Sequence, residues 1–129
     1  MSGKSYRDLE VWKEARILVV AVYKATETFP KNQQYSLVQQ LQRAAVSVSS
    51  NIAEGYGRKT PGEFLYHLRV ARGSLCELET LMILAQDLAF VSGRDFDTLD
   101  ERIQRTGRLL GGLLRYLESK AESEHRVAT

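Results

Sequence analysis

The chain has 129 residues, of which 43% are apolar and 26% are charged, and it contains two prolines. This composition is typical of a globular protein, and the length allows one domain, residues 1–129, while it excludes a catalytic domain joined to a separate partner domain. The formal net charge of +2 is too small to indicate nucleic-acid binding by itself, because nucleic-acid-binding domains are normally markedly basic or carry a clustered basic face.

The first two predicted helices span residues 8–29 and 36–55. In each, apolar residues recur at steps of three and four and therefore share one helical face. The first face consists of Trp12, Ala15, Val19, Val22, Thr26 and Phe29, and the second of Leu37, Leu41, Ala44, Val48 and Ile52. Pro30 ends the first helix, Ser36 and Gln39 have the spacing of a capping box, and Gly55 and Gly57 favour a turn after the second helix.

The third and fourth predicted helices span residues 61–89 and 95–119. Thr60, Pro61 and Glu63 provide an N-cap, a proline at the first helical position and a glutamate at the third. The third apolar face consists of Phe64, Leu68, Ala71, Leu75, Leu78, Met82 and Ala85, and the fourth of Leu99, Ile103, Thr106, Leu110, Leu113 and Leu117. Residues 120–129 are predicted to be a polar, frayed tail.

These elements predict an all-α protein, because no segment has the pattern of a strand. Short connections favour antiparallel neighbours, and the repeating apolar face of every helix suits shallow crossing angles. The predicted fold is an antiparallel up-down four-helix bundle.

Cysteine content and apolar run lengths bear on the compartment. The single cysteine, Cys76, excludes an internal disulfide and a cysteine-cluster metal site, which is typical of a reducing compartment. Residues 1–7 are polar, and the longest apolar run, residues 17–22, is too short to cross a bilayer. We therefore expect a cytoplasmic protein without membrane contact.

Two of the predicted helices are apolar on a second face as well. At about 100° per residue, Ile17, Val20 and Ala21 point away from the first apolar face. The third helix has apolar residues outside its main face too, namely Leu65, Cys76, Ile83 and Leu84. Exposed to water, such faces would exceed the apolar patch of a usual soluble monomer. We therefore expect a homo-oligomer with closed symmetry, a wide bundle core being the alternative. The predicted interface consists of Ile17, Val20, Ala21, Leu65, Ile83 and Leu84.

The residues that a catalytic or metal site would need are missing. Di-iron and di-manganese bundles use Glu-x-x-His pairs, and the chain has none; His125 lies in the polar tail, and Glu63 with His67 has the spacing of a surface pair. The apolar and acidic neighbours of Cys76 favour buried packing over nucleophilic chemistry. The Gly-Tyr-Gly turn follows no strand and lacks the lysine of a P-loop. We therefore expect no enzyme, metal, cofactor or small-molecule substrate.

Two polar groups are candidate functional features. A polar stripe on the second helix includes Gln40, Arg43, Ser47, Asn51 and Glu54, and we interpret it as interhelical hydrogen bonding, because mid-helix Ser and Asn need a partner. The second feature is a set of basic residues at two places. On the fourth helix these are Arg105, Arg108 and Arg115, with Arg102 somewhat apart, and beside Tyr56 they are Arg58 and Lys59. These cations could contact nucleic-acid phosphates or form a solvated face with scattered ion pairs.

Three segments resemble a known family. They are residues 9–15 (LEVWKEA), 40–55 (QLQRAAVSVSSNIAEG) and 71–80 (ARGSLCELET). They are similar to the bacterial four-helix bundle proteins first noticed as reading frames within intervening sequences of 23S ribosomal RNA genes. The similarity runs from about Leu9 to Leu117, and the Ser-Asn-Ile-Ala-Glu-Gly string is its most specific part.

The resemblance implies an antiparallel four-helix bundle that assembles as a cyclic pentamer. Relatives include the accessory protein of diversity-generating retroelements, a basic pentamer that binds reverse transcriptase and nucleic acid. One hypothesis is therefore a homo-oligomeric module that binds RNA or a nucleic-acid-processing partner through the basic residues. The alternative is a protein-interaction scaffold without a nucleic-acid role. A third hypothesis is an enzyme that uses Ser47, Asn51 and Glu54, but no catalytic base, set of metal ligands or cofactor-binding loop accompanies these residues.

Overall fold

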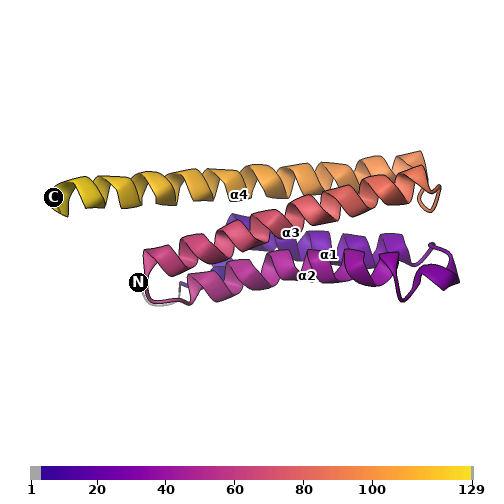
Figure 1. The fold of residues 1–129 in the computed structure, drawn as a ribbon, viewed down its shortest axis with the longest axis horizontal. Coiled ribbons are helices and arrows are strands. Elements are labelled where there is room, and N and C mark those ends of the chain that lie inside the picture. The colour runs from indigo at the N-terminus through magenta and orange to yellow at the C-terminus, as the bar shows by residue number, and fades with distance from the viewer. Residues whose placement is uncertain (1–3, 129) are drawn as a thin grey trace.

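The computed structural model describes residues 4–128, with side chains described for residues 4–124. Four α-helices form an antiparallel bundle with two short 3-10 helices before α1 and α2 (Figure 1). In chain order the elements are η1 Tyr6–Asp8, α1 Glu10–Thr26, η2 Lys31–Gln33, α2 Leu37–Tyr56, α3 Pro61–Asp87 and α4 Gly93–Ala128. No strand occurs in this part of the chain.

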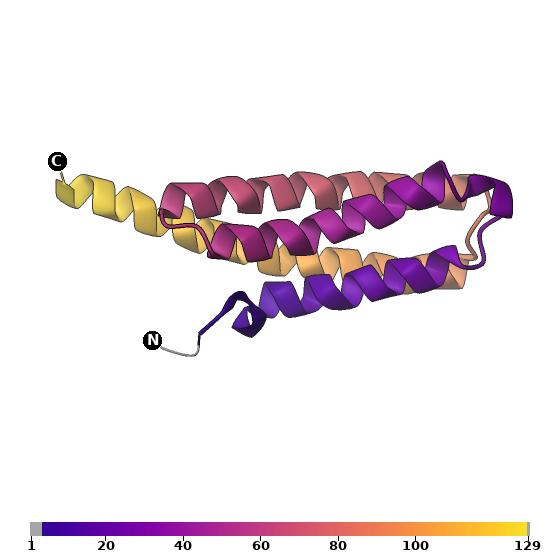
Figure 2. The same ribbon diagram turned by 90° about the horizontal axis from the view of Figure 1, so that it is seen from below.

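Figure 2 shows the helices running lengthwise alongside one another, with the α1–α2 and α3–α4 connections at the same end of the bundle. α2 packs against α1 and α3, and α4 packs against α3 and α1. Within the described residues α1 and α3 do not contact each other, so they lie diagonally across the bundle. The predicted fold class is therefore confirmed.

Two predicted helix starts differ in how they are capped. Thr60 caps α3 as predicted, because its Oγ1 accepts the N–H of Glu63 at 3.1 Å. The capping box predicted at Ser36 is wrong. The Ser36 side chain makes no cap hydrogen bond to α2 and instead donates to Oε1 of Gln33 at 3.0 Å. The preceding turn of 3-10 helix places this acceptor within reach.

α4 is longer than predicted. It continues through Ala128, so the expected frayed tail at residues 120–129 is wrong except for Thr129, which lies outside the described residues. Residues 113–128 contain no glycine or proline, and the Leu, Arg, Glu, Lys and Ala residues among them have high helix propensity. Figure 1 shows the end of α4 extending past the start of α3. None of the helices in residues 4–128 is long and apolar enough to span a membrane.

The core follows the predicted faces of α2 and α3 but shifts on α1. Val11 and Leu18 are buried there, whereas Trp12 and Val19 are half-buried. Compared with the prediction, α1 is rotated about its axis, so that its buried face includes Glu14, which faces α4. The ring of Trp12 instead meets that of Tyr6, with centroids 5.1 Å apart.

Candidate functional site

A chain of hydrogen bonds joins the middle of α2 to α3. The hydroxyl oxygens of Ser47 and Ser74 lie 2.7 Å apart. Asn51 donates from Nδ2 to the carbonyl oxygen of Ser47 at 2.9 Å and to its hydroxyl at 3.1 Å, and Oδ1 of Asn51 lies 3.0 Å from Nδ1 of His67. Contacts within the bundle therefore account for a serine and an asparagine in a helix interior.

Glu54 extends this network to the α2–α3 turn. Its Oε1 lies 2.8 Å from Nη2 of Arg58 and 3.8 Å from Nε2 of His67. Arg43, which belongs to the same predicted stripe, is exposed and makes no hydrogen bond to this network in the described part of the chain. The structure thus brings together Ser47, Asn51 and Glu54, but not Arg43.

Gly55 sets the distance between the two helices at this network. A Cβ added to Gly55 would lie 2.6 Å from Cβ of His67 and 3.0 Å from Cδ1 of Phe64. Real Cβ atoms essentially never approach so closely, so α3 can reach this position only over a glycine. Among residues 4–124, no three His, Cys, Asp or Glu side chains are grouped so that they could hold a metal ion.

The cations predicted on α4 have different surroundings. Nε of Arg105 lies 3.0 Å from Oε1 of Glu14 on α1, and Nη1 of Arg102 lies 3.6 Å from the same atom. Glu14 is buried, and its Oε1 receives no well-aligned hydrogen bond, so the contact is an ion pair that holds α1 to α4. Arg108 and Arg115 are exposed. Among the side chains of residues 4–124, Arg108 and Arg115 find no ion-pair partner, while Arg105 is partly neutralised by Glu14.

The second basic group lines a small cavity at one end of the bundle. Arg58 and Lys59 from the α2–α3 turn meet Lys120 and Glu124 from the distal part of α4 around a volume of about 250 Å³. Arg58 is already paired with Glu54. Along α4, Lys120 lies about 18 Å beyond Arg108 but only about 8 Å beyond Arg115, so the two basic groups adjoin at this end of the helix.

The predicted interface residues divide into exposed and buried ones. Ile17, Val20, Ile83 and Leu84 have 41–50% of their surface exposed, and Ala21 is half-buried. Leu65 is 6% exposed and belongs to the core, so its predicted place at an oligomer interface is wrong. Near its start α3 turns a wider face inward, because Phe64 also packs there against Tyr56. The predicted burial of Cys76 is wrong as well: it is exposed on the outer side of α3.

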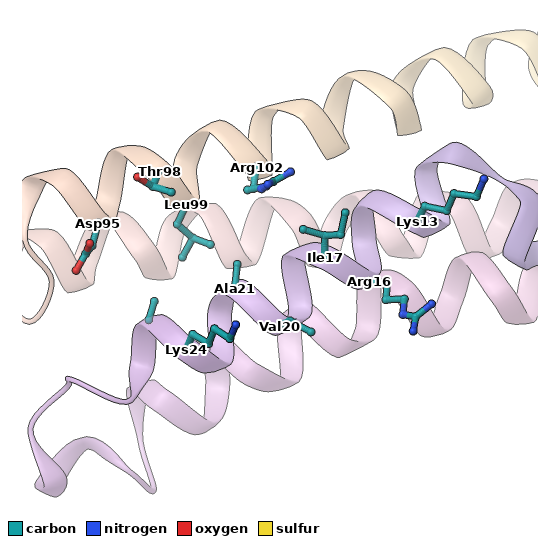
Figure 3. A pocket seen from close by; sticks show the side chains of 11 residues that line it. Lys13, Arg16, Ile17, Val20, Ala21, Lys24, Asp95, Thr98, Leu99 and Arg102 are labelled. Carbon is teal, nitrogen blue, oxygen red and sulfur yellow. The ribbon is translucent and has the colours of Figure 1, made fainter.

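A groove of about 730 Å³ runs between α1 and α4. We call it the α1–α4 groove. Its apolar lining consists of Ile17, Val20, Ala21, Ala25 and Leu99, and its polar lining consists of Lys13, Arg16, Lys24, Asp95, Thr98 and Arg102. Figure 3 shows these side chains along the neighbouring sides of the two helices.

Most of the chain matches a known protein family. The family model of the 23S rRNA-intervening sequence protein matches residues 7–112, which is most of the chain. The protein belongs to this family. A solved structure of a protein with unknown function from the S23 ribosomal protein family of Bacteroides thetaiotaomicron has the same fold, with a TM-score of 0.76. It is 16% identical, over 81% of this chain and 95% of that one. No curated protein matches the chain.

Two site residues of this 23S rRNA-intervening sequence family member were missed by sequence reasoning. His67 and Glu14 were not predicted to take part in interhelical contacts. His67 lies sixteen residues from its partner Asn51, and Glu14 lies on the helix opposite Arg102 and Arg105, so no local spacing indicates either contact. The available signal was that Glu14 lies one helical turn from Val11 and from Leu18, because a charged residue on an apolar face needs a partner.

Proposed function

We propose that this protein is a non-enzymatic homo-oligomeric binding module that engages RNA or a nucleic-acid-processing partner. The observation that carries the proposal is the exposure of Ile17 and Val20 on α1 and of Ile83 and Leu84 on α3. Apolar side chains on two faces of a small bundle are typical of surfaces that another molecule covers. Family resemblance favours a cyclic pentamer.

Cations on α4 and at the end of the bundle would provide the nucleic-acid contacts. Arg108 and Arg115 on α4 are exposed, and Lys59 and Lys120 lie across the cavity at the end of the bundle. In a ring, each of these groups is repeated once per copy, which raises the effective affinity for a long polyanion. The hydroxyl, amide and imidazole groups of the α2–α3 network contact one another, which supports a structural role for them.

The test combines mass and binding. Light scattering of the purified protein at micromolar concentration should give a mass several times that of one 14.6 kDa chain. Binding to structured RNA should weaken with salt, and the double variant Arg108→Gln/Arg115→Gln should reduce the slope of log K against log salt by about 2 for each copy that contacts the RNA. Arg72→Gln, an exposed arginine on α3, is the matched control and should leave the slope unchanged. A monomer, or no RNA binding at low ionic strength, would contradict the corresponding part of the proposal.

The second candidate function is a protein-interaction scaffold without a nucleic-acid role. It is favoured by the ion pairs of Arg105 with Glu14 and of Arg58 with Glu54, which leave fewer cations for phosphates. Recovery of the same protein partner before and after nuclease treatment, together with no salt-sensitive RNA binding, would support this function over the first.

A further inference from the structure

The α1–α4 groove is an apolar floor with a basic rim. Ile17 and Val20 remain 41% and 50% exposed, and four cations stand beside them against one carboxylate, Asp95. The cations are Lys13, Arg16, Lys24 and Arg102. Lys13 and Arg102 have carboxylate neighbours at 3.4 Å and 3.6 Å, but all four lie at the groove. Its chemistry suits a partner that is apolar and acidic.

The outer side of α3 has the opposite character. Ile83, Leu84 and Leu88 are 45%, 45% and 57% exposed, and we call them the α3 ridge. The exposed carboxylates Glu77 and Asp87 flank the ridge, and residues 73–93 contain no lysine, arginine or histidine. From Glu77 to Leu88 the helix rises about 16 Å, and α1 rises about 18 Å from Lys13 to Ala25 along the groove. The two surfaces therefore match in length as well as in charge.

We propose that the α3 ridge of one copy docks in the α1–α4 groove of the next copy. The inference rests on the homo-oligomer of the proposed function and specifies how its copies meet. Pairing groove with groove would bring Lys13, Arg16 and Lys24 of two copies together, and pairing ridge with ridge would bring their carboxylates together; both arrangements are disfavoured by like-charge repulsion. Groove against ridge places opposite charges across a shared apolar centre.

The position of the two surfaces on the bundle determines what the contact builds. α1 and α3 lie diagonally across the bundle, so each copy carries a groove on one side and a ridge on the other. A contact between two different surfaces is heterologous and continues from copy to copy until rotation closes a ring. The same two surfaces would then be used at every junction, and none of them would be left exposed.

Mixing two assembly-defective variants tests this arrangement. Val20→Glu places a carboxylate in the groove, where it repels the acidic ridge, and Leu84→Glu disrupts the ridge. Each variant alone should fall to the mass of one chain in light scattering. An equimolar mixture should form a dimer of two chains, because the intact ridge of Val20→Glu can dock in the intact groove of Leu84→Glu. Assembly should stop there, because only the two disrupted surfaces of the pair are left free. Tyr35→Glu, at a residue that is 91% exposed and outside both surfaces, is the control and should assemble like the unchanged protein.

The outcomes separate this inference from the proposed function. If the unchanged protein is a monomer, the homo-oligomer itself is overturned. If it assembles but either variant keeps its mass, or the mixture stays monomeric while circular dichroism shows both variants folded, only the groove-to-ridge contact is overturned. A variant that forms a stable dimer by itself would indicate a symmetric interface and would also overturn the contact.

Discussion

At Gly55 the approach of α3 to α2 leaves no room for a side chain. A methyl group there would meet Cβ of His67, which belongs to the next helix and cannot move without shifting its backbone. The glycine is therefore needed for close contact between the two helices, although a glycine within a helix lowers stability by about 1 kcal/mol relative to alanine. This contact explains why the Ser-Asn-Ile-Ala-Glu-Gly string has a glycine after Glu54.

Gly55→Ala should lower the free energy of unfolding by about 1–3 kcal/mol, because overpacking a close contact outweighs the better helix propensity of alanine. Gly73→Ala is the matched control, since a Cβ there meets nothing within 4 Å, and it should raise stability by up to about 1 kcal/mol. Urea unfolding followed by circular dichroism measures both. Equal effects of the two substitutions would refute the steric account.

Glu14 is the other residue with an unusual environment. It is 8% exposed and has Arg102 and Arg105 beside it, whose side chains are 44% and 58% exposed. The arginines therefore stay partly hydrated while the carboxylate does not, and water around the arginines screens their attraction to the carboxylate.

Glu14→Gln keeps the size of the side chain and removes its charge. We expect a loss of about 1–2 kcal/mol in unfolding free energy, in the range of a contact to a charged group that is partly hydrated. Glu10→Gln removes an equivalent charge from an exposed pair with Lys13 and should change stability by about 0.5 kcal/mol or less. A Glu14→Gln protein as stable as the Glu10→Gln protein would show that the interhelical ion pair adds nothing.

At the scale of single helices, α2 and α3 begin with similar residue types but different hydrogen bonds. The hydroxyl of Thr60 accepts the N–H of Glu63, whereas the hydroxyl of Ser36 turns back to Gln33. A sequence motif for capping therefore describes a helix start correctly only when the preceding residues leave the side chain free.

Thr60→Ala should destabilise the protein by about 1 kcal/mol, the usual effect of losing an N-cap. Ser36→Ala should stay within about 0.5 kcal/mol, since no cap hydrogen bond is lost. Thermal unfolding of both variants distinguishes them. A larger loss for Ser36→Ala than for Thr60→Ala would contradict the assignment of caps.

α4 extends beyond the bundle, and its last described side chains are exposed. Truncation after Ala121 removes exposed polar contacts, including that of Glu124 at the cavity with Arg58 and Lys59, so it should lower the unfolding free energy by about 1 kcal/mol or less. Leu114→Ala in the core of the same helix should lower it by about 2–5 kcal/mol, because Leu114 is 1% exposed. Denaturant titration compares them. A loss above about 2 kcal/mol on truncation would contradict this prediction, because it would mean that residues 122–129 contribute more than exposed contacts.

At the scale of the whole molecule, the sequence predicted the helix number, their order and most of the buried faces of α2 and α3. These features could be predicted because the spacing of apolar residues within a single helix indicates which side of that helix is buried. The rotation of α1 toward Glu14, the burial of Leu65 and the exposure of Cys76 were not predicted, because they depend on how neighbouring helices meet. The same holds for the pairing of Asn51 with His67.

The contact between α1 and α4 joins the two ends of the chain. In residues 4–128 every other contacting pair of α-helices is adjacent in sequence, whereas Glu14 and Arg105 are separated by most of the chain. Closing so long a segment loses the most chain entropy, so we expect this contact to form last during folding. A weakened ion pair would then accelerate unfolding more than it slows folding, and the first and last helices would separate while the central pair is still intact.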